Sequence, residues 1–227
     1  ATVASPPPNR NVANPVCEPK PAVVKQNVDP EGLGRVKVQF VWQQQPELSP
    51  WIRLMTTHSG EDRGFYFVPE LEDEVWVGFE HNNPDKPYVL GSMYHGKAKP
   101  SGSWPNDNDD IKAIKTKSGN EIQINDEAGK EEVKIINKDG QNEISMTLSG
   151  EGKITIKTSG LLEISAKEIT MSAEKTIDVK AGGDISVNTD ANANITATKD
   201  ALVEGSMNIN LNGGTAANVK AGVIKLN

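Results

Sequence analysis

The chain has 227 residues and a formal net charge of -7, with 36% hydrophobic but only 5% aromatic residues. This acidic balance, with a pI of about 5.1, argues against nucleic acid as a partner, because phosphate binding needs a cluster of Lys and Arg. The sequence also has no apolar run near the roughly 20 residues of a membrane-spanning helix, and its first residues lack the basic start and apolar centre of a signal peptide.

Residues 1–21 form the first distinct segment and are rich in proline. Proline has no backbone N–H, so it interrupts helices and inner strands. We therefore predict an extended arm or linker over this range. Cys17 is the single cysteine, so no intrachain disulfide is possible, and we assign it no role.

Residues 22–99 contain every Phe, Tyr and His of the chain and three of its four Trp. Short alternating segments separated by Gly, Pro, Asp and Asn indicate strands. Val36, Val38 and Phe40 share one face of the first segment, and we expect Phe40 and Trp42 to pack inside. The pattern predicts a small antiparallel barrel such as an OB-fold. Its strands are expected near residues 35–42, 51–55, 64–69, 73–80 and 88–94.

Candidate reactive groups in this segment and in the predicted linker, residues 100–117, do not form a recognisable site. The three histidines match no common metal spacing, the acidic run at residues 70–74 lies at a turn, and the Asp cluster lacks the Gly and distal Glu of an EF-hand. We predict no catalytic, cofactor-binding or metal-binding residue. The groups considered are His58, His81, His95, Glu70, Glu72, Asp73, Glu74, Asp107, Asp109 and Asp110.

Residues 118–227 contain no aromatic side chain, and pairs of small or aliphatic residues recur at i and i+2 instead. Such a pair lies on one face of a strand, while the residue between the two faces the other way. The pairs start seven or eight residues apart, and looser copies precede them at Ile122/Ile124, Val133/Ile135 and Ile144/Met146. The regular pairs are Ile154/Ile156, Leu162/Ile164, Ile169/Met171, Ile177/Val179, Ile185/Val187, Ala193/Ile195, Ala201/Val203 and Ile209/Leu211.

One such octad cannot be stable alone, because two aliphatic side chains do not offset the entropy lost on ordering eight residues. The apolar faces and strand edges must therefore be shared between repeats. A single chain could coil into a solenoid, or three chains could wind around one axis and each supply one strand per layer. The period itself does not distinguish these two arrangements.

Four segments in the barrel region resemble a known family: "DPEGLGRVKVQF" (residues 29–40), "WIRL" (51–54), "GFYFVPELEDEVWVGFE" (64–80) and "NPDKPYVLGSMY" (83–94). In this order they are similar to the OB-fold of VgrG proteins, the spikes of bacterial type VI secretion systems, and to phage tail needles. The resemblance covers residues 22–95. It implies an all-β chain, with an OB-fold at residues 22–99 and an intertwined trimeric β-helix, or β-prism, at residues 118–227. It also leads us to expect that the family's N-terminal hub domain is absent from this sequence.

The resemblance further implies a homotrimeric, membrane-puncturing spike tip that transmits axial force and has no enzymatic activity. Such a protein is assembled in the bacterial cytoplasm and injected by the contractile machine, with tube or hub proteins and effectors as partners and a transient passage through the target membrane. The apolar pairs from Ile154/Ile156 to Ile209/Leu211 would form the trimer core. A PAAR-like tip protein would contact the last apolar residues, which are Val219, Val223, Ile224 and Leu226.

Two other classes of protein fit parts of the sequence. A polysaccharide-degrading β-helical tail enzyme would need carboxylates and aromatic side chains in a groove, and residues 118–227 provide no aromatic residue. An OB-fold module on a stalk, binding nucleic acid or carbohydrate, would need basic and aromatic residues alternating on an exposed strand. Residues 35–42 carry only a weak form of that pattern.

Overall fold

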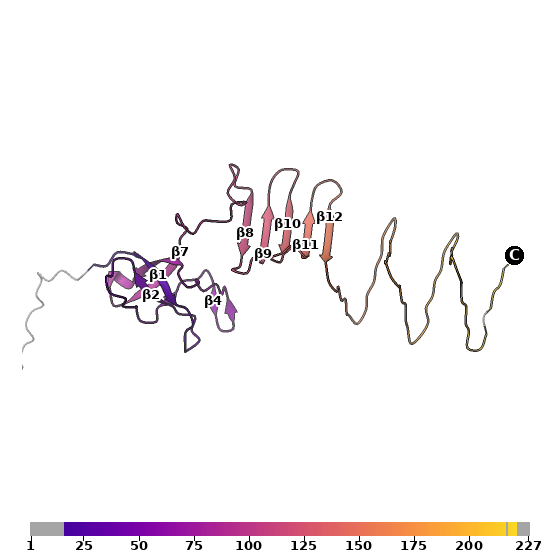
Figure 1. The fold of residues 1–227 in the computed structure, drawn as a ribbon, viewed down its shortest axis with the longest axis horizontal. Coiled ribbons are helices and arrows are strands. Elements are labelled where there is room, and N and C mark those ends of the chain that lie inside the picture. The colour runs from indigo at the N-terminus through magenta and orange to yellow at the C-terminus, as the bar shows by residue number, and fades with distance from the viewer. Residues whose placement is uncertain (1–15, 217, 222–227) are drawn as a thin grey trace, which may run out of the picture. The chain divides into compact units, whose positions relative to one another are not determined.

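The computed structural model describes residues 16–216 and 218–221, and almost all of its regular structure is β (Figure 1). The chain divides into two compact units, one ending at Glu163 and the other beginning at Ile164. The first unit contains every strand of the described residues, together with one short 3-10 turn, η1 (Glu80–Asn82). The predicted all-β class is therefore confirmed.

The first sheet has five strands in the order β2-β1-β6-β7-β3. All neighbouring strands are antiparallel except β3 and β7, which are parallel. A backbone bridge between Val36 and Ile52 joins the two outer strands, so the sheet curls back on itself as a small barrel. The strands are β1 (Lys20–Gln26), β2 (Lys37–Phe40), β3 (Arg53–Leu54), β6 (Glu74–Phe79) and β7 (Pro87–Ser92).

The barrel core is small and consists mainly of valine. Alternation places Val36, Val38 and Phe40 inside, as the sequence predicts. The rings of Phe40 and Phe79 stack with their centroids 6.0 Å apart. The prediction that Trp42 packs inside is wrong: it lies beyond the end of β2, is exposed, and stacks on Phe40 from the surface. The buried apolar residues are Ala22, Val24, Val36, Val38, Phe40, Ile52, Val75, Val77, Phe79 and Val89.

Strand β1 begins at Lys20, although prolines were expected to exclude a strand before Ala22. Pro21 pairs with Trp76 of β6, and its carbonyl accepts a hydrogen bond from the Val41 amide (3.3 Å). Proline is tolerated here because it lies next to the first residue of the strand, and only its carbonyl is used on the β2 side.

The segment at residues 64–69 was predicted as a strand, and this prediction is wrong. The chain forms only a two-residue hairpin, β4 (Ser59–Gly60) and β5 (Arg63–Gly64), and then continues without regular structure. Three consecutive aromatic residues cannot all face one side of a strand. Phe65, Tyr66 and Phe67 are in fact all exposed.

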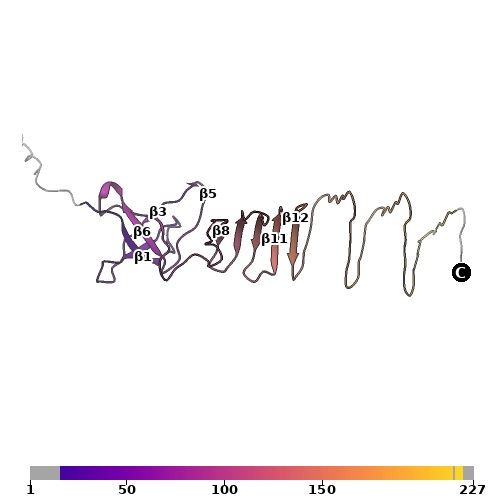
Figure 2. The same cartoon turned by 90° about the horizontal axis from the view of Figure 1, so that it is seen from above.

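A second five-stranded sheet follows the barrel in sequence and is an antiparallel meander, in which each strand pairs with the next (Figures 1 and 2). Its strands are β8 (Ile111–Lys115), β9 (Glu121–Asn125), β10 (Glu132–Ile136), β11 (Asn142–Thr147) and β12 (Lys153–Thr158). Each connection contains glycine in the left-handed region, with φ between 66° and 90°. These glycines allow the tight reversals and are Gly119, Gly129, Gly140, Gly150 and Gly152.

The looser apolar pairs thus lie in strands that hydrogen-bond within one chain, whereas we expected one strand per layer from each of three chains. Pair starts at residues 122, 133, 144 and 154 are separated by 11, 11 and 10 residues. That spacing accommodates a five- or six-residue strand and a glycine turn. The octads have two or three residues fewer per repeat.

Residues 164–216 and 218–221, the described part of the second unit, reverse direction repeatedly in Figures 1 and 2 without forming strands. The described residues of this unit include none with positive φ and no backbone-to-backbone hydrogen bond. Among the described residues, their peptide groups therefore have no backbone partners. The trimeric β-helix predicted for residues 118–227, like the domain limits given above, stays a prediction.

Candidate functional site

One face of the β8–β12 sheet carries two continuous rows of apolar side chains. The register aligns Ile122 with Ile135, and Ile124 with Val133, and the neighbouring strands extend both rows. Directly opposed side chains of this kind are the unit of contact within a sheet. The first row is Ile114, Ile122, Ile135, Ile144 and Ile156; the second is Ile124, Val133, Met146 and Ile154, with Lys112 at its β8 end.

These two rows, which we call the apolar face, are left partly exposed by the described part of the chain. Their side chains are between 37% and 73% exposed. A single subunit therefore presents a contiguous apolar surface across five strands, and surfaces of this kind mark interaction sites. Covering one half-exposed aliphatic side chain contributes about 1 kcal/mol, so the whole face represents a substantial driving force for association.

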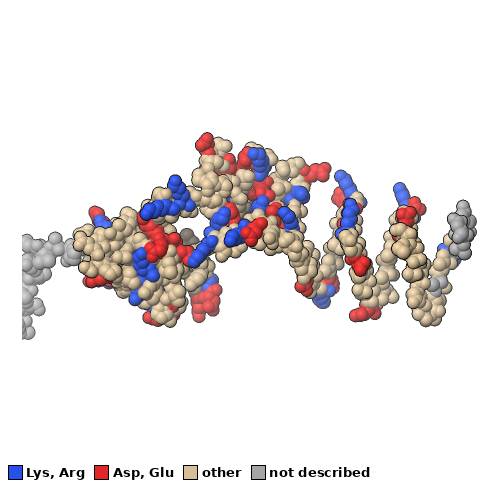
Figure 3. Space-filling view, in the orientation of Figure 1, with Lys and Arg blue, Asp and Glu red and all other residues tan. Residues whose placement is uncertain are grey.

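The opposite face of the same sheet is more polar and better protected. Ser145 is buried, and ion pairs join Lys115 to Glu121 (3.0 Å) and Lys134 to Glu143 (3.6 Å). Trp104, from the predicted linker, donates its indole N–H to Glu121 (2.9 Å). In the view of Figure 3, charges of both signs are interspersed over this region. The sheet therefore has one face with satisfied polar groups and one uncovered apolar face.

Glu121 has a perturbed carboxyl group at the centre of this polar arrangement. Partial burial alone raises the pKa of Glu121, but the hydrogen bond from Trp104 and the ion pair with Lys115 outweigh it and lower the pKa below its ordinary value. The carboxylate is thus held ionised by its neighbours. Nothing in this arrangement requires a catalytic role.

The predicted trimer-core residues between positions 162 and 211 are not buried against one another in the described part of the chain. From Leu162 onward every one of them is exposed, from 51% at Ile209 to 92% at Ile195. Their apolar side chains are exposed, and their backbone groups make no backbone-to-backbone hydrogen bond in the described part of the chain. The residues are Leu162, Ile164, Ile169, Met171, Ile177, Val179, Ile185, Val187, Ile195, Val203, Ile209 and Leu211.

Of the four residues predicted to contact a tip protein, only Val219 lies in the described part of the chain, where it is exposed. Val223, Ile224 and Leu226 lie outside the described residues. Contact with a tip protein therefore stays a prediction.

The candidate reactive groups of the barrel do not gather into a site. Among the described residues no group of three His, Cys, Asp or Glu side chains could hold a metal ion. Glu72 forms an ion pair with Lys25 (2.7 Å), and Asp73 accepts a hydrogen bond from the Glu70 amide (2.8 Å). The acidic run thus fixes the turn before β6. His81 lies in η1, His58 and His95 lie in two separate loops, and Asp109 pairs with Lys112.

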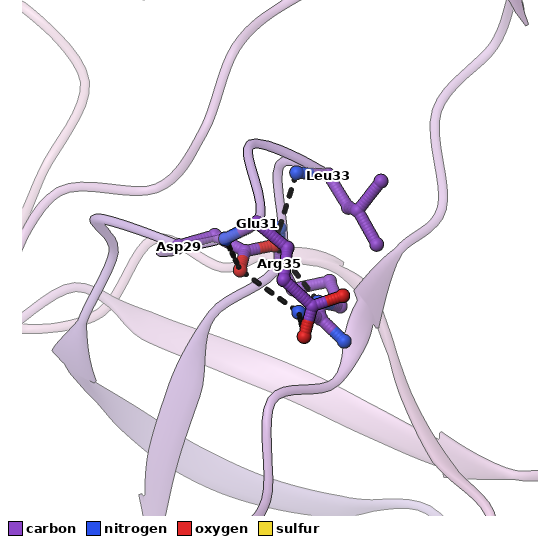
Figure 4. A network of polar contacts seen from close by, with 4 residues as sticks. All are labelled: Asp29, Glu31, Leu33 and Arg35. Atoms are coloured by element: carbon purple, nitrogen blue, oxygen red, sulfur yellow. Dashed lines mark hydrogen bonds and ion pairs between the residues drawn. The ribbon is translucent and has the colours of Figure 1, made fainter.

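Sequence reasoning missed the best-connected polar cluster of the barrel, which Figure 4 shows. Gly32 and Gly34 adopt positive φ, and the turn they shape wraps around Asp29, whose side chain is only 2% exposed. Asp29 accepts hydrogen bonds from the amides of Glu31 and Leu33 (3.0 and 3.1 Å) and from the Arg35 guanidinium (2.8 and 2.9 Å). The Asp and Arg at the two ends of "DPEGLGR" (residues 29–35) were the sequence signal that could have predicted this ion pair.

This cluster shifts the ionisation of both partners. The Arg35 hydrogen bonds, supported by the backbone amides, hold the pKa of Asp29 far below its usual range despite burial. The same contact raises the pKa of Arg35. The cluster fixes the entry to β2 and has no open coordination position, so we interpret it as structural.

The exposed aromatic run Phe65–Phe67 was also missed as a surface feature. With Leu33 and Arg53 it lines an open cavity of about 700 Å³ on the barrel. Exposed aromatic side chains of this kind are common at protein interfaces.

The barrel region matches a known protein family. Residues 20–94 match the family model described as the type VI secretion system/phage-baseplate injector OB domain. None of the helices in the described part of the chain has the length and apolar character to cross a membrane.

Three relatives from Pseudomonas aeruginosa illustrate the similarity. The chain is 34% identical over 110 residues to the type VI secretion system spike protein VgrG5, which covers 44% of the chain and 14% of the relative. It is 31% identical over 135 residues to the spike protein VgrG1a, a match that covers 52% of the chain and 20% of the relative. It is 34% identical over 102 residues to the spike protein VgrG2a, a match that covers 41% of the chain and 12% of the relative. The matches thus span one fifth or less of each relative. Residues 20–94 are therefore an injector OB domain, and over part of its length the chain is similar to VgrG spike proteins.

Proposed function

We propose that this chain is a structural part of a spike in a bacterial contractile injection apparatus, and that it works as a homotrimer. Its injector OB domain and its similarity to proteins named as type VI secretion spikes support this assignment. A spike of this kind needs mechanical rigidity and does not need to catalyse a reaction. In this proposal the chain has no enzymatic activity, is assembled in the bacterial cytoplasm and leaves the cell with the machine.

The observation that carries the proposal is that the strands of the apolar face are followed in sequence by octads whose described residues make no backbone-to-backbone hydrogen bond. Ile154 and Ile156 end the two rows of the apolar face, and Leu162 and Ile164 begin the octads. Unpaired backbone amides and carbonyls must find partners when apolar side chains are buried. Other copies of the chain can supply both, with strands of the same period and apolar surface of the same spacing.

In a threefold assembly the apolar pairs would face the common axis and the residues between them would face water. Strand edges would then lie between subunits and would not be open to solvent. Because each layer shares hydrogen bonds with its neighbours, the layers must be disrupted together. We infer that the rod can transmit axial force through a target envelope for this reason.

At the far end we propose a separate tip protein of the PAAR type, contacted by Val219, Val223, Ile224 and Leu226. Tube or hub proteins and effectors would complete the partner set, as expected for a spike.

The mass of the protein in solution tests the trimer. Light scattering coupled to size exclusion is expected to give about three times the 24.5 kDa of one chain. A folded, elongated particle with the mass of one chain, even at high concentration, would contradict the homotrimer and favour a single-chain solenoid.

A further inference from the structure

We propose that the apolar face of β8–β12 is the surface through which the three copies first recognise one another, and that this docking sets the register in which the octads of residues 164–221 subsequently pair. This inference rests on the proposed homotrimer. It assigns different tasks to two regions that the sequence presents as one repeat.

The β8–β12 sheet can form in one subunit before any association. All five strands find their hydrogen-bond partners within the chain, and every reversal is made by a glycine turn. The polar face is also complete: Glu121 is held by Trp104 and Lys115, and Lys134 pairs with Glu143. The subunit thus offers a preformed surface with only its apolar face open.

The octads, by contrast, cannot form alone. Their described residues make no backbone-to-backbone hydrogen bond with one another, and the apolar member at every repeat is more than half exposed. A segment with so few contacts has a low free energy of local unfolding compared with the rest of a structure. Its order must come from neighbouring chains, so it follows docking.

A preformed docking surface would fix the register in which the octads of the three chains pair. A strand ladder whose repeats are alike can slip, and a slip of one whole octad keeps every apolar pair opposite another. The apolar face is not periodic in this way. Lys112 occupies one end of the second row, Met146 lies near the other, and Ile154/Ile156 in β12 mark where the face ends. Three such faces can therefore dock in one register only. After docking, the three chains would continue past Gly160 at the same level along the axis.

The occupant of this surface is a second and a third copy of the chain. From Ile154/Ile156 to Leu162/Ile164 the apolar pairs continue at octad spacing, so one occupant that covers both must have the same period. An unrelated protein has no reason to share it. The chain's own residues 164–221, folded back on the sheet, are the remaining alternative, and the experiment below distinguishes it.

Pulse-labelling hydrogen exchange during refolding of the full chain tests the order of events. We expect the amides of β8–β12 to gain protection first, at a rate that does not depend on concentration. The amides of residues 164–221 should gain protection later, at a rate that rises with concentration. Simultaneous protection of both regions would overturn the proposal. So would protection of residues 164–221 in particles with the mass of one chain.

Two matched substitutions in β12 separate the faces, since neighbouring residues point to opposite sides. Ile156→Asp places a charge on the apolar face and is expected to yield particles of single-chain mass, at least a tenfold weaker association, and no protection beyond residue 160. Lys157→Asp places the same side chain on the opposite face and should leave the trimer intact. Protection of β8–β11 in both variants shows that the sheet itself has folded.

A third substitution, Ile185→Asp, lies within the octads and should leave the trimer mass unchanged while protection is lost locally around residue 185. A trimer that survives Ile156→Asp but is lost with Ile185→Asp would overturn the docking order and leave the homotrimer standing. A wild-type protein of single-chain mass would instead contradict the homotrimer itself.

Discussion

At the scale of single residues, the arrangement around Asp29 shows how a short motif fixes a strand. Asp29 is nearly buried, yet it accepts hydrogen bonds from backbone amides and from the Arg35 guanidinium. Such charge-assisted bonds are stronger than neutral ones. Gly32 and Gly34 are required because the turn that brings these donors together passes twice through the left-handed region. The motif therefore defines where β2 begins, and the barrel closes from there through Val36 and Ile52.

Asp29→Asn removes the charge from this cluster and should lower the melting temperature of the OB domain by several degrees at neutral pH. Because the folded pKa of Asp29 is depressed, its contribution is present above the ordinary carboxyl pKa and is lost as pH falls below it. Wild-type stability should therefore fall below about pH 4, and the variant should lose less stability over that range. Circular dichroism melts at several pH values measure this.

Glu31→Gln is the matched control for this prediction. Glu31 also pairs with Arg35 (3.0 Å) but is well exposed, so its loss should change the melting temperature little. Two results would contradict the assigned role of Asp29. One is an equal change in melting temperature from both substitutions, and the other is a loss of stability at low pH in Asp29→Asn that equals that of the wild type.

At the scale of elements, the spacing of apolar pairs decides how the chain finds partners. Pairs 10 or 11 residues apart leave room for a strand and a reversal, and each reversal between β8 and β12 has a glycine with positive φ. Octad turns have no such residue in the described part of the chain. The chain therefore passes from strands that pair with one another to a described segment without strands, and the change occurs between Thr158 and Ile164.

Gly129→Ala tests the role of these turns in the β8–β12 sheet. Gly129 has φ of +80° and open space around it, so alanine is disfavoured only by its backbone conformation. We expect a loss of about 1–2 kcal/mol in the free energy of unfolding of the sheet, measured by urea denaturation with hydrogen exchange as the local probe. Gly182→Ala, at a site that is equally open and without positive φ, should be close to neutral. A neutral Gly129→Ala would show that the turn does not depend on glycine.

At the scale of the whole molecule, the buried hydrophobic core of the described residues lies in the OB domain. The apolar face and residues 164–221 instead expose their aliphatic side chains. Association is therefore expected to contribute a large part of the stability of everything that follows the barrel. This agrees with the proposed spike, which must not come apart under load.

Unfolding should consequently depend on protein concentration. For a trimer that dissociates as it melts, the melting temperature of residues 111–221 rises with concentration by mass action, while that of the barrel changes little. Calorimetry over a hundredfold range of concentration, under reversible conditions, should show one transition that shifts and one that does not. Concentration-independent melting of both parts would contradict obligate association.

The sequence alone determined the class of fold and the nature of the repeat. Alternation at Val36, Val38 and Phe40 identified a buried strand face, and the i, i+2 pairs identified octads, because side-chain direction along a strand depends only on parity. Four motif segments also pointed to the family that the comparisons support. The sequence analysis missed the strand at Pro21, which depends on pairing with the distant strand β6. It also missed the exposure of Trp42 and Phe65–Phe67. The contacts of Asp29 were missed as well, although they are local and lie within six residues.

The spacing in the sequence distinguished the looser pairs from the octads, but only the tertiary structure showed that the looser pairs and Ile154/Ile156 lie in strands that pair within one chain. It also determined the register that aligns Ile122 with Ile135 and Ile124 with Val133 into the rows of the apolar face. Register depends on which strands pair and where each turn reverses the chain, and these are long-range outcomes that an alternating pattern does not specify.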